Sequence, residues 1–261
     1  MQRHVIPIAG VELELFEFGE GRPIVFLHGA SGFAPEHPFV ALLSARHRLI
    51  APSHPGFGAS SLPDWIDAVA DIACIHLELL DRLGLDQVDV IGCSIGGWIA
   101  AELASMSPKT VRRLMLVGPV GVKTGPADRL DIPDIFALPQ ADVEKLLFHD
   151  PERMRIDLAR LDDEQLAISV RNRETLALLA WEPYMHNPKL RHRLHRVIAP
   201  ALFLRGESDG LVSAQYLAAY ARLLPHARTE TIAAAGHVPH IEQPEAFART
   251  VLAFLEAGAA S

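Results

Sequence analysis

The alternation of hydrophobic and polar residues along the chain predicts eight strands. Residues 4–8 and 11–18 alternate around Ala9-Gly10, which is typical of a hairpin of two antiparallel strands. A later run, PIVFLH at residues 23–28, is continuously apolar, and such runs indicate a strand that is buried on both faces. The remaining strands are expected at residues 47–51, 88–91, 111–117, 200–205 and 229–232.

Apolar residues at helical spacing lie between these strands. Val69, Ile72 and Leu80 mark one face of a helix expected at residues 65–83, which Gly84 ends. Other helices are predicted at residues 39–43, 97–106, 213–224 and 244–257. Strands that alternate with helices in this way are typical of an α/β fold, a mostly parallel sheet with helices on both faces.

The alternation lapses between residues 122 and 197. Three helices are predicted there, at residues 142–148, 152–161 and 163–181, and no strand. We therefore predict a core domain made of residues 1–121 and 198–261, and a helical insertion at residues 122–197 that interrupts it.

Residues 88–101, VDVIGCSIGGWIAA, are predicted to form a strand, a sharp turn and a helix, with Ser94 at the tip of the turn. Gly92 and Gly96 lie two residues before and after the serine, which lets the backbone turn tightly and lets helix and strand approach closely. The pattern is typical of a nucleophile elbow, although a glycine-rich turn without chemistry is the alternative. In an elbow, the amide of Ile95 at the helix N-terminus would help to hold a negative oxygen.

A serine that transfers acyl groups needs a histidine to accept its proton and a carboxylate to orient that histidine. Because ligands bind beyond the carboxyl ends of parallel strands, the partners of Ser94 should lie in loops that follow strands. Asp209 follows the predicted strand at residues 200–205, and His237 follows the one at residues 229–232. We expect Ser94, Asp209 and His237 to meet at one edge of the sheet.

Other side chains compete for these roles. Glu207 is an alternative acid, and His28, His54 and His240 are alternative bases, although His28 is expected to brace a loop and the other two to line or flank the pocket. None of the thirteen histidines shows paired spacing backed by carboxylates. We therefore expect neither a metal ion nor another cofactor.

Five motifs stand in register along nearly all of residues 4–257. They are His28-Gly29, Pro55-Gly56-Phe57-Gly58 with Ser60, Gly92-Cys93-Ser94-Ile95-Gly96-Gly97, Gly206 with Asp209, and Gly236-His237 followed by Pro239, Glu242 and Pro244. Together they resemble the α/β-hydrolase fold superfamily of cap-bearing serine hydrolases. The resemblance implies a mostly parallel eight-stranded sheet with helices on both faces and an inserted helical cap.

The same resemblance implies roles for particular residues. The backbone amides of Ala30 and Ile95 would form the oxyanion hole, and residues 122–197 would be the cap that covers the pocket. Cap side chains that could line an apolar acyl pocket are Phe148, Met154, Trp181, Tyr184 and Met185. Aromatic residues at helical spacing also form the core of a cap, so both roles stay open.

The serine indicates an enzyme that hydrolyses a small-molecule carboxylic ester or a related acyl compound through an acyl-enzyme intermediate. Epoxide hydrolases and haloalkane dehalogenases with a similar cap attack with aspartate at this position, which argues against them. Carbon-carbon bond hydrolases of aromatic ring-fission products are an alternative, but they commonly carry Asn and Trp where this chain has Cys93 and Val238. A non-catalytic small-molecule receptor of the same fold is another. A further departure is Ser53, where many relatives place Asp.

Composition narrows the partners and the compartment. The formal net charge of -8 over 261 residues disfavours nucleic acid as a partner. Cys74 and Cys93, both in apolar settings, make no disulfide framework, and Cys93 should point into the core. No signal peptide, anchor or apolar run of about 18 residues is visible. We expect a cytoplasmic protein that acts on a small molecule without a membrane partner, in an oligomeric state that the sequence leaves open.

Overall fold

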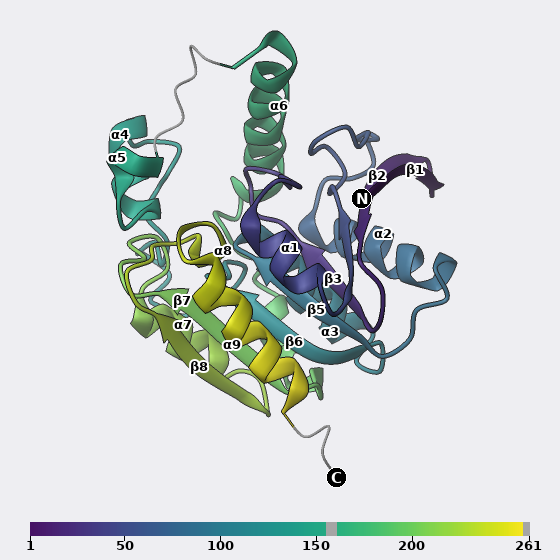
Figure 1. Ribbon diagram of the computed structural model, residues 1–261. Helices are drawn as coiled ribbons and strands as arrows, with labels where there is room; N and C mark the ends of the chain where they lie inside the picture. The colour runs from purple at the N-terminus through teal and green to yellow at the C-terminus, as the bar shows by residue number, and fades with distance from the viewer. Residues whose placement is uncertain (155–160, 258–261) are drawn as a thin grey trace.

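The computed structural model describes residues 1–154 and 161–257, and an eight-stranded sheet lies at its centre (Figure 1). The strands are β1 (Gln2–Ile8), β2 (Val11–Phe18), β3 (Pro23–Leu27), β4 (Arg48–Pro52), β5 (Val88–Cys93), β6 (Val111–Val117), β7 (Ala201–Gly206) and β8 (Ala227–Ile232). They lie in the order β1-β2-β4-β3-β5-β6-β7-β8. β2 pairs antiparallel with both neighbours, and the pairs from β4 to β8 are parallel. The predicted α/β fold with a mostly parallel sheet is confirmed.

The central strands are buried because their sequences carry small and apolar residues on both faces. Every residue of β5 is buried, including Asp89, whose carboxylate pairs with Arg112 at 2.5 Å. The parallel register places Leu27 of β3 beside Gly92 of β5, and Cys93 beside Val117 of β6. The loops after β3, β5 and β6 therefore open at the same edge of the sheet, where parallel sheets bind their ligands.

Helices cover both faces of the sheet. Those outside residues 122–197 are α1 (Pro38–Ser44), α2 (Val69–Arg82), α3 (Ile95–Met106), α7 (Ala214–Ala221), α8 (Pro239–Glu242) and α9 (Pro244–Glu256). Apolar residues of α2, α3 and α7 pack on one face of the sheet, and those of α1 and α9 pack on the other. The sheet thus lies between two hydrophobic layers, which is the arrangement that the alternating sequence pattern predicts.

Residues 122–197, which we call the inserted segment, hold α4 (Gln140–Leu147), α5 (Pro151–Met154), α6 (Asp163–Ala180) and the short 3-10 helices η2 (Leu190–His192) and η3 (Leu194–Arg196). In the parts that the structure describes, 122–154 and 161–197, no residue joins the sheet. α6 stands above the edge of the sheet, and α4 and α5 lie toward β7 and β8 (Figure 1).

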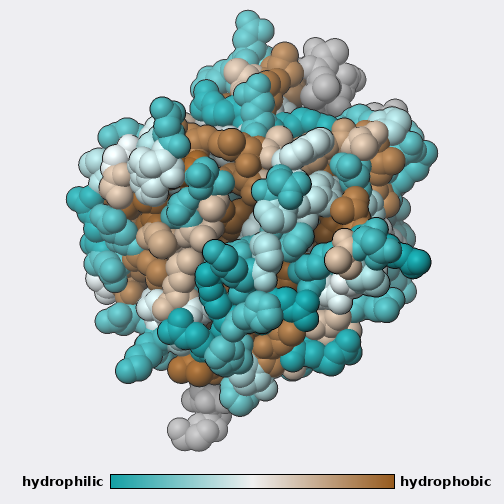
Figure 2. Space-filling model, turned by 180° about the vertical axis from the view of Figure 1, so that it is seen from behind, coloured by the Kyte–Doolittle hydropathy of each residue, from teal (hydrophilic) through white to brown (hydrophobic). Residues whose placement is uncertain are grey.

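The surface of α6 is partly apolar. Its side chains Leu166, Val170 and Leu178 are 41%, 50% and 56% exposed. Figure 2, seen from behind, shows brown side chains among teal ones at the upper end of the molecule, where α6 stands in Figure 1. The helix begins at a capping box, in which Asp162 Oδ1 accepts from Gln165 N at 2.8 Å and Gln165 Oε1 accepts from Asp162 N at 3.1 Å.

Some sequence predictions need correction. The helix expected from residue 65 begins at Val69, where the Asp71 carboxylate accepts from Ala68 N at 3.1 Å and marks the first turn. The short helix α8 was not predicted, and most of the helix expected at residues 152–161 lies outside the described residues. Cys74 is exposed rather than in an apolar setting. Across the described ranges, no helix has both the length and the apolar character needed to cross a membrane.

Candidate active site

Ser94 stands at the turn between β5 and α3. Its backbone has φ 56° and ψ -117°, a conformation with positive φ that is strained for a residue with a side chain. The flanking glycines make the close approach possible, because a Cβ at Gly92 would run into the carbonyl of Gly96, and one at Gly96 into that of Leu27. This geometry is typical of a nucleophile elbow, and it leaves the serine half-buried at the tip.

Two loops bring a carboxylate and an imidazole together. Asp209 follows β7, His237 follows β8, and both side chains are buried. His237 Nδ1 donates to Asp209 Oδ2 at 3.0 Å, while Asp209 Oδ1 accepts from the amides of Leu211 and Val212 at 2.9 and 2.8 Å. Both carboxylate oxygens are therefore occupied. An imidazole that donates from Nδ1 has Nε2 as the nitrogen that can accept a proton.

The imidazole lies at the same edge of the sheet as the serine. Ser94 N donates to Val117 O at 2.9 Å. The next residue, Gly118, lies against the ring of His237, since a Cβ there would be 2.9 Å from both Cε1 and Nδ1. Within the described part of the chain, the buried His237 Nε2 has no hydrogen-bond partner. An acceptor nitrogen in this position can take a proton from a nearby hydroxyl group.

The backbone amides of Ile95 and Ala30, expected to hold a negative oxygen, belong to the two segments next to Ser94. Ile95 is the first residue of α3, so its N–H has no acceptor within the helix, and the helix N-terminus attracts negative charge. Ala30 belongs to the turn after β3. That turn passes beside the serine, because a Cβ at Gly29 would lie 3.5 Å from Ser94 Cβ.

The alternative acid and one alternative base have hydrogen-bond partners other than this pair. Glu207 is exposed, and its Oε2 accepts from Ala234 N at 3.4 Å. His240 is buried in a cage of three phenylalanine rings, with Cys93 Sγ 3.9 Å from its Nδ1. Burial lowers the pKa of His240 to about 3 and raises the pKa of the Cys93 thiol. As expected, Cys93 points into the core.

His28, His54 and His76 form a buried chain of imidazoles beneath the turn after β3. His28 Nδ1 donates to Gly29 O at 2.7 Å, and His28 Nε2 accepts from His54 N at 3.1 Å. His54 Nε2 donates to His28 O at 3.0 Å, so its Nδ1 accepts from His76 Nε2 at 2.8 Å. Burial lowers the pKa of His28 to about 4 and that of His76 to about 3, and it lowers the pKa of His54 as well. The three neutral rings hold the turn, and His54 lies under it instead of facing a pocket.

The side chains expected to line the pocket lie at different depths. Phe148 and Met154 are half-buried, Met185 is buried, and Trp181 is 57% exposed. Phe148 lies next to the loop that carries His237, because a Cβ at Gly236 would be 2.8 Å from Phe148 Cα. A role for Phe148 in the pocket is therefore consistent with its position.

The remaining aromatic side chains pack on one another. The ring of Phe136 lies 5.3 Å from that of Trp181 and 6.2 Å from that of Tyr184. Tyr184 Oη donates to Pro133 O at 2.7 Å and accepts from Ile135 N at 3.0 Å. These contacts stay within the inserted segment, which agrees with the alternative that helix-spaced aromatics form its own core.

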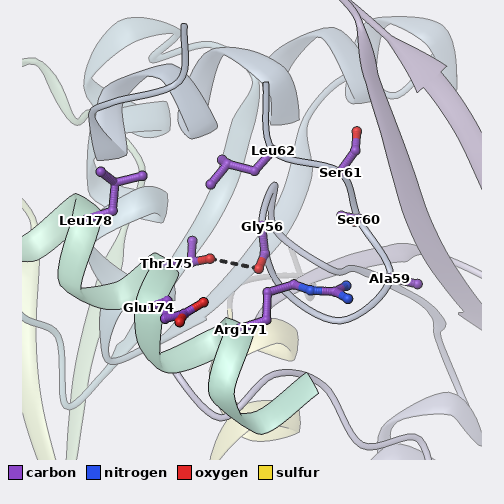
Figure 3. A pocket seen from close by; sticks show the side chains of 9 residues that line it. All are labelled: Gly56, Ala59, Ser60, Ser61, Leu62, Arg171, Glu174, Thr175 and Leu178. Atoms are coloured by element: carbon purple, nitrogen blue, oxygen red, sulfur yellow. Dashed lines mark hydrogen bonds between the residues drawn. The ribbon is translucent and has the colours of Figure 1, made fainter. Parts of the chain in front are cut away.

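A hollow of about 510 Å³ lies between α6 and the loop after β4 (Figure 3). Figure 3 shows Thr175 pointing at Gly56, whose carbonyl accepts its hydroxyl at 2.9 Å. The Asp209 and His237 pair and Ser94 do not line this hollow. Its lining residues are Gly56, Ala59, Ser60, Ser61, Leu62, Arg171, Glu174, Thr175 and Leu178.

Glu14 on β2 is a site-supporting residue that the sequence analysis missed. Ser53, which stands where many relatives place Asp, donates its hydroxyl to Glu14 Oε2 at 2.6 Å, and Ala59 N donates to the same oxygen at 3.1 Å. Arg3 pairs with the other oxygen at 2.6 Å. Glu14 of β2 thus supplies the carboxylate acceptor for the loop after β4. The signal in the sequence was a charged residue between two leucines in a predicted strand.

A family model described as the Alpha/beta hydrolase family matches residues 24–250. The match spans the elbow with Ser94 and the loops with Asp209 and His237. The chain belongs to the alpha/beta hydrolase family. The matched region also contains the whole inserted segment, so the family resemblance extends through both parts of this hydrolase.

Known relatives of this hydrolase act on different substrates, as their names state. It is 31% identical over 258 residues to the 2-hydroxymuconate semialdehyde hydrolase of Pseudomonas putida, covering 95% of this chain and 92% of the relative. It is 27% identical over 255 residues to the pimeloyl-(acyl-carrier protein) methyl ester esterase of Photobacterium profundum, covering 91% and 96%. The fold is also that of a meta-cleavage product hydrolase, CumD, from Pseudomonas fluorescens IP01, with a TM-score of 0.77 and 21% identity over 96% of this chain and 97% of that one.

Proposed function

We propose that this protein is a serine hydrolase in which Ser94, His237 and Asp209 act as a catalytic triad. The observation that supports this most directly is the buried pairing of His237 Nδ1 with Asp209 Oδ2 at 3.0 Å, in loops at the same sheet edge as the strained serine turn. A histidine held in this tautomer presents Nε2 to a hydroxyl group. Membership of the alpha/beta hydrolase family supports the same roles.

In the proposed reaction, His237 Nε2 takes the proton of Ser94 while Oγ attacks the substrate carbonyl carbon. The amides of Ala30 and Ile95 stabilise the oxyanion, and Asp209 stabilises the imidazolium. The leaving group takes the proton from His237 and departs, which leaves an acyl-enzyme on Ser94. Water then attacks this ester with His237 as the base, and the acid product is released.

The substrate class that we propose is a carboxylic ester of a small molecule. Carbon-carbon hydrolases commonly carry Asn before the nucleophile and Trp after the histidine, whereas Cys93 and Val238 occupy these places here. The buried Cys93 side chain contacts His240 in the core and not the site. The similarity to an esterase over 91% of the chain supports this assignment.

Cleavage of a carbon-carbon bond in a ring-fission product is the second candidate. The 31% identity to a 2-hydroxymuconate semialdehyde hydrolase over 95% of the chain favours it. For either substrate we propose that the inserted segment, residues 122–197, is a cap on a core of residues 1–121 and 198–261. Phe148, Met154, Trp181, Tyr184 and Met185 stay predicted pocket residues, and a cytoplasmic location stays a prediction.

Two measurements test the function. Treatment with a fluorophosphonate should add its mass to Ser94 in the wild-type protein and not in Ser94→Ala, and labelling at Cys93 or elsewhere would contradict the triad. Hydrolysis should then be compared between p-nitrophenyl esters of graded acyl length and a 2-hydroxy-6-oxo-dienoate. A higher kcat/KM for the esters supports the first candidate, and a preference for the dienoate selects the second. If fluorophosphonate does not label Ser94 and the protein hydrolyses neither the esters nor the dienoate, the proposed function is wrong.

A further inference from the structure

Asn172 on α6 is a buried polar side chain with both ends of its amide occupied. It is 3% exposed. Its Nδ2 donates to Ser31 O at 3.1 Å, and its Oδ1 accepts from Gly58 N at 3.1 Å. These partners determine the orientation of the amide, since the Ser31 carbonyl requires the NH2 group and the Gly58 N–H requires the oxygen. One side chain of the inserted segment thus joins two loops of the core.

The first of these loops is the turn that contains the Ala30 amide. Gly32 N donates to Gly29 O at 3.1 Å and closes the turn, which ends at the Ser31 carbonyl bound by Asn172. The Gly29 carbonyl and the Ala30 N–H belong to one planar trans peptide and point in opposite directions. Whatever holds this turn therefore also sets the direction of the Ala30 N–H.

The turn is held from two sides. From below, His28 Nδ1 donates to Gly29 O at 2.7 Å, and His54 supports His28. From above, Asn172 holds the Ser31 carbonyl. The lower support belongs to the core, whereas the upper one comes from the inserted segment, so the geometry of the turn depends on where α6 sits.

Two neighbours of Asn172 attach α6 to the core but do not bond to this turn. Thr175 Oγ1 donates to Gly56 O at 2.9 Å, a contact visible in Figure 3, and Arg171 Nη1 donates to Gly58 O at 2.8 Å. Thr175 is as buried as Asn172, at 3% exposed. The chain therefore offers a matched pair, two buried polar residues one turn apart on the same helix, of which Asn172 reaches the Ser31 carbonyl.

We propose that Asn172 is a positioning residue for the oxyanion hole. Its hydrogen bond to Ser31 O links the position of α6 to the direction of the Ala30 N–H. The inference rests on the proposed serine-hydrolase function. Its consequence is that the inserted segment takes part in transition-state stabilisation as well as covering the site. Loss of one complete oxyanion donor costs about 10²-fold to 10³-fold in kcat, so loss of its positioning should cost about 10-fold to 10²-fold.

The test compares Asn172→Asp with Thr175→Val. Aspartate at position 172 keeps an acceptor for Gly58 N, but its second oxygen faces the Ser31 carbonyl oxygen and repels it. Valine at position 175 removes the hydrogen bond to Gly56 O and leaves the bond from Asn172 to Ser31 O in place. With p-nitrophenyl butyrate, Asn172→Asp should lower kcat about 10-fold to 10²-fold with KM nearly unchanged. Inhibition by an alkyl trifluoromethyl ketone, whose adduct places an oxyanion in the hole, should weaken by a similar factor. Thr175→Val should change both quantities by less than about threefold, although it also lowers the melting temperature.

Asn172→Ser gives the same comparison if Asn172→Asp does not fold. Equal effects of the Asn172 and Thr175 variants on kcat and on ketone inhibition, at similar melting temperatures, would overturn the proposal. Failure of the proposed function is a separate result, because the wild-type protein would then lack fluorophosphonate labelling at Ser94 before any Asn172 variant is compared.

Discussion

At the scale of single residues, Gly118, which directly follows β6, lies against the ring of His237. Its φ is +49°, a left-handed backbone that favours glycine. A Cβ at this position would lie 2.9 Å from Cε1 and Nδ1 of His237 and 3.3 Å from Asp209 Oδ2. The added carbon would therefore press on the hydrogen bond between His237 and Asp209.

We predict that Gly118→Ala lowers kcat by about 10²-fold, because a displacement of about 1 Å is enough to misplace a catalytic group. Gly84→Ala is the matched control, since Gly84 also has positive φ (+63°) but has open space around its Cβ position. Both variants should lose similar stability, about 1 kcal/mol, from the backbone alone. Ester hydrolysis and thermal melting of the two variants measure this, and equal kcat values at equal stability would contradict the prediction.

At the scale of elements, the end of α4 and the residues after it bind both loops that carry the proposed partners of Ser94, Asp209 and His237. Gly210 N donates to Leu146 O at 2.9 Å, and His237 N donates to Leu147 O at 2.6 Å. His149 Nδ1 lies 2.7 Å from Ser208 Oγ. Together with Asn172, these contacts mean that the inserted segment binds the turn that contains Ala30 and the loops that carry Asp209 and His237.

Glu242 on α8 completes this connection. One carboxylate oxygen accepts from Gly236 N at 2.6 Å, next to His237, and the other accepts from His149 N at 2.8 Å in the inserted segment. The sequence motif after the histidine contains this glutamate, but its two partners lie on separate parts of the chain. The Glu242 carboxylate thus links the loop that carries His237 to the inserted segment.

We predict that Glu242→Gln lowers the free energy of unfolding by about 1–2 kcal/mol and lowers kcat several-fold. The glutamine amide keeps one acceptor oxygen, and its nitrogen cannot accept from the second backbone N–H. Glu245→Gln is the control, since it removes the same charge from an exposed position three residues away. Urea unfolding and ester hydrolysis should show both losses for Glu242→Gln and neither for Glu245→Gln. If the two variants unfold at the same urea concentration, Glu242 does not fasten the loop.

At the scale of the whole molecule, buried histidines couple folding to pH. Burial lowers the pKa of His28 to about 4 and of His76 and His240 to about 3, against 6.5 for an exposed histidine. Between these values the unfolded chain binds protons that the folded protein does not, so stability rises with pH. The stabilisation is complete above pH 6.5 and is lost as the pH falls toward 4 and below.

We predict that the free energy of unfolding falls as the pH drops from 6.5 to 4, with each buried histidine adding a slope of up to about 1.4 kcal/mol per pH unit. Replacing His240 with Phe should remove one such contribution and leave a shallower dependence. Urea unfolding at several pH values measures the slopes, and an unchanged slope in His240→Phe would refute the prediction for that residue.

The sequence by itself determined the strands, most helices and the loops to examine. Apolar runs such as residues 23–27 predict strands because burial on both faces requires such runs, and the observed β3 covers these residues. Glycines at 92 and 96 predict the sharp turn, because the close approach excludes a side chain there. Asp209 and His237 could be selected because the loops after parallel strands open at one edge. All of this information is local in the chain or follows from topology.

Only the tertiary structure decided which distant side chains support the site. Asn172 and Ser31 are 141 residues apart, and His149 and Glu242 are 93 apart. Glu14 could replace an aspartate at position 53 only because β2 and β4 pair in the register that places them together. Periodicity reports which face of an element is buried, but the partner of a buried polar group depends on packing between elements that no local pattern encodes.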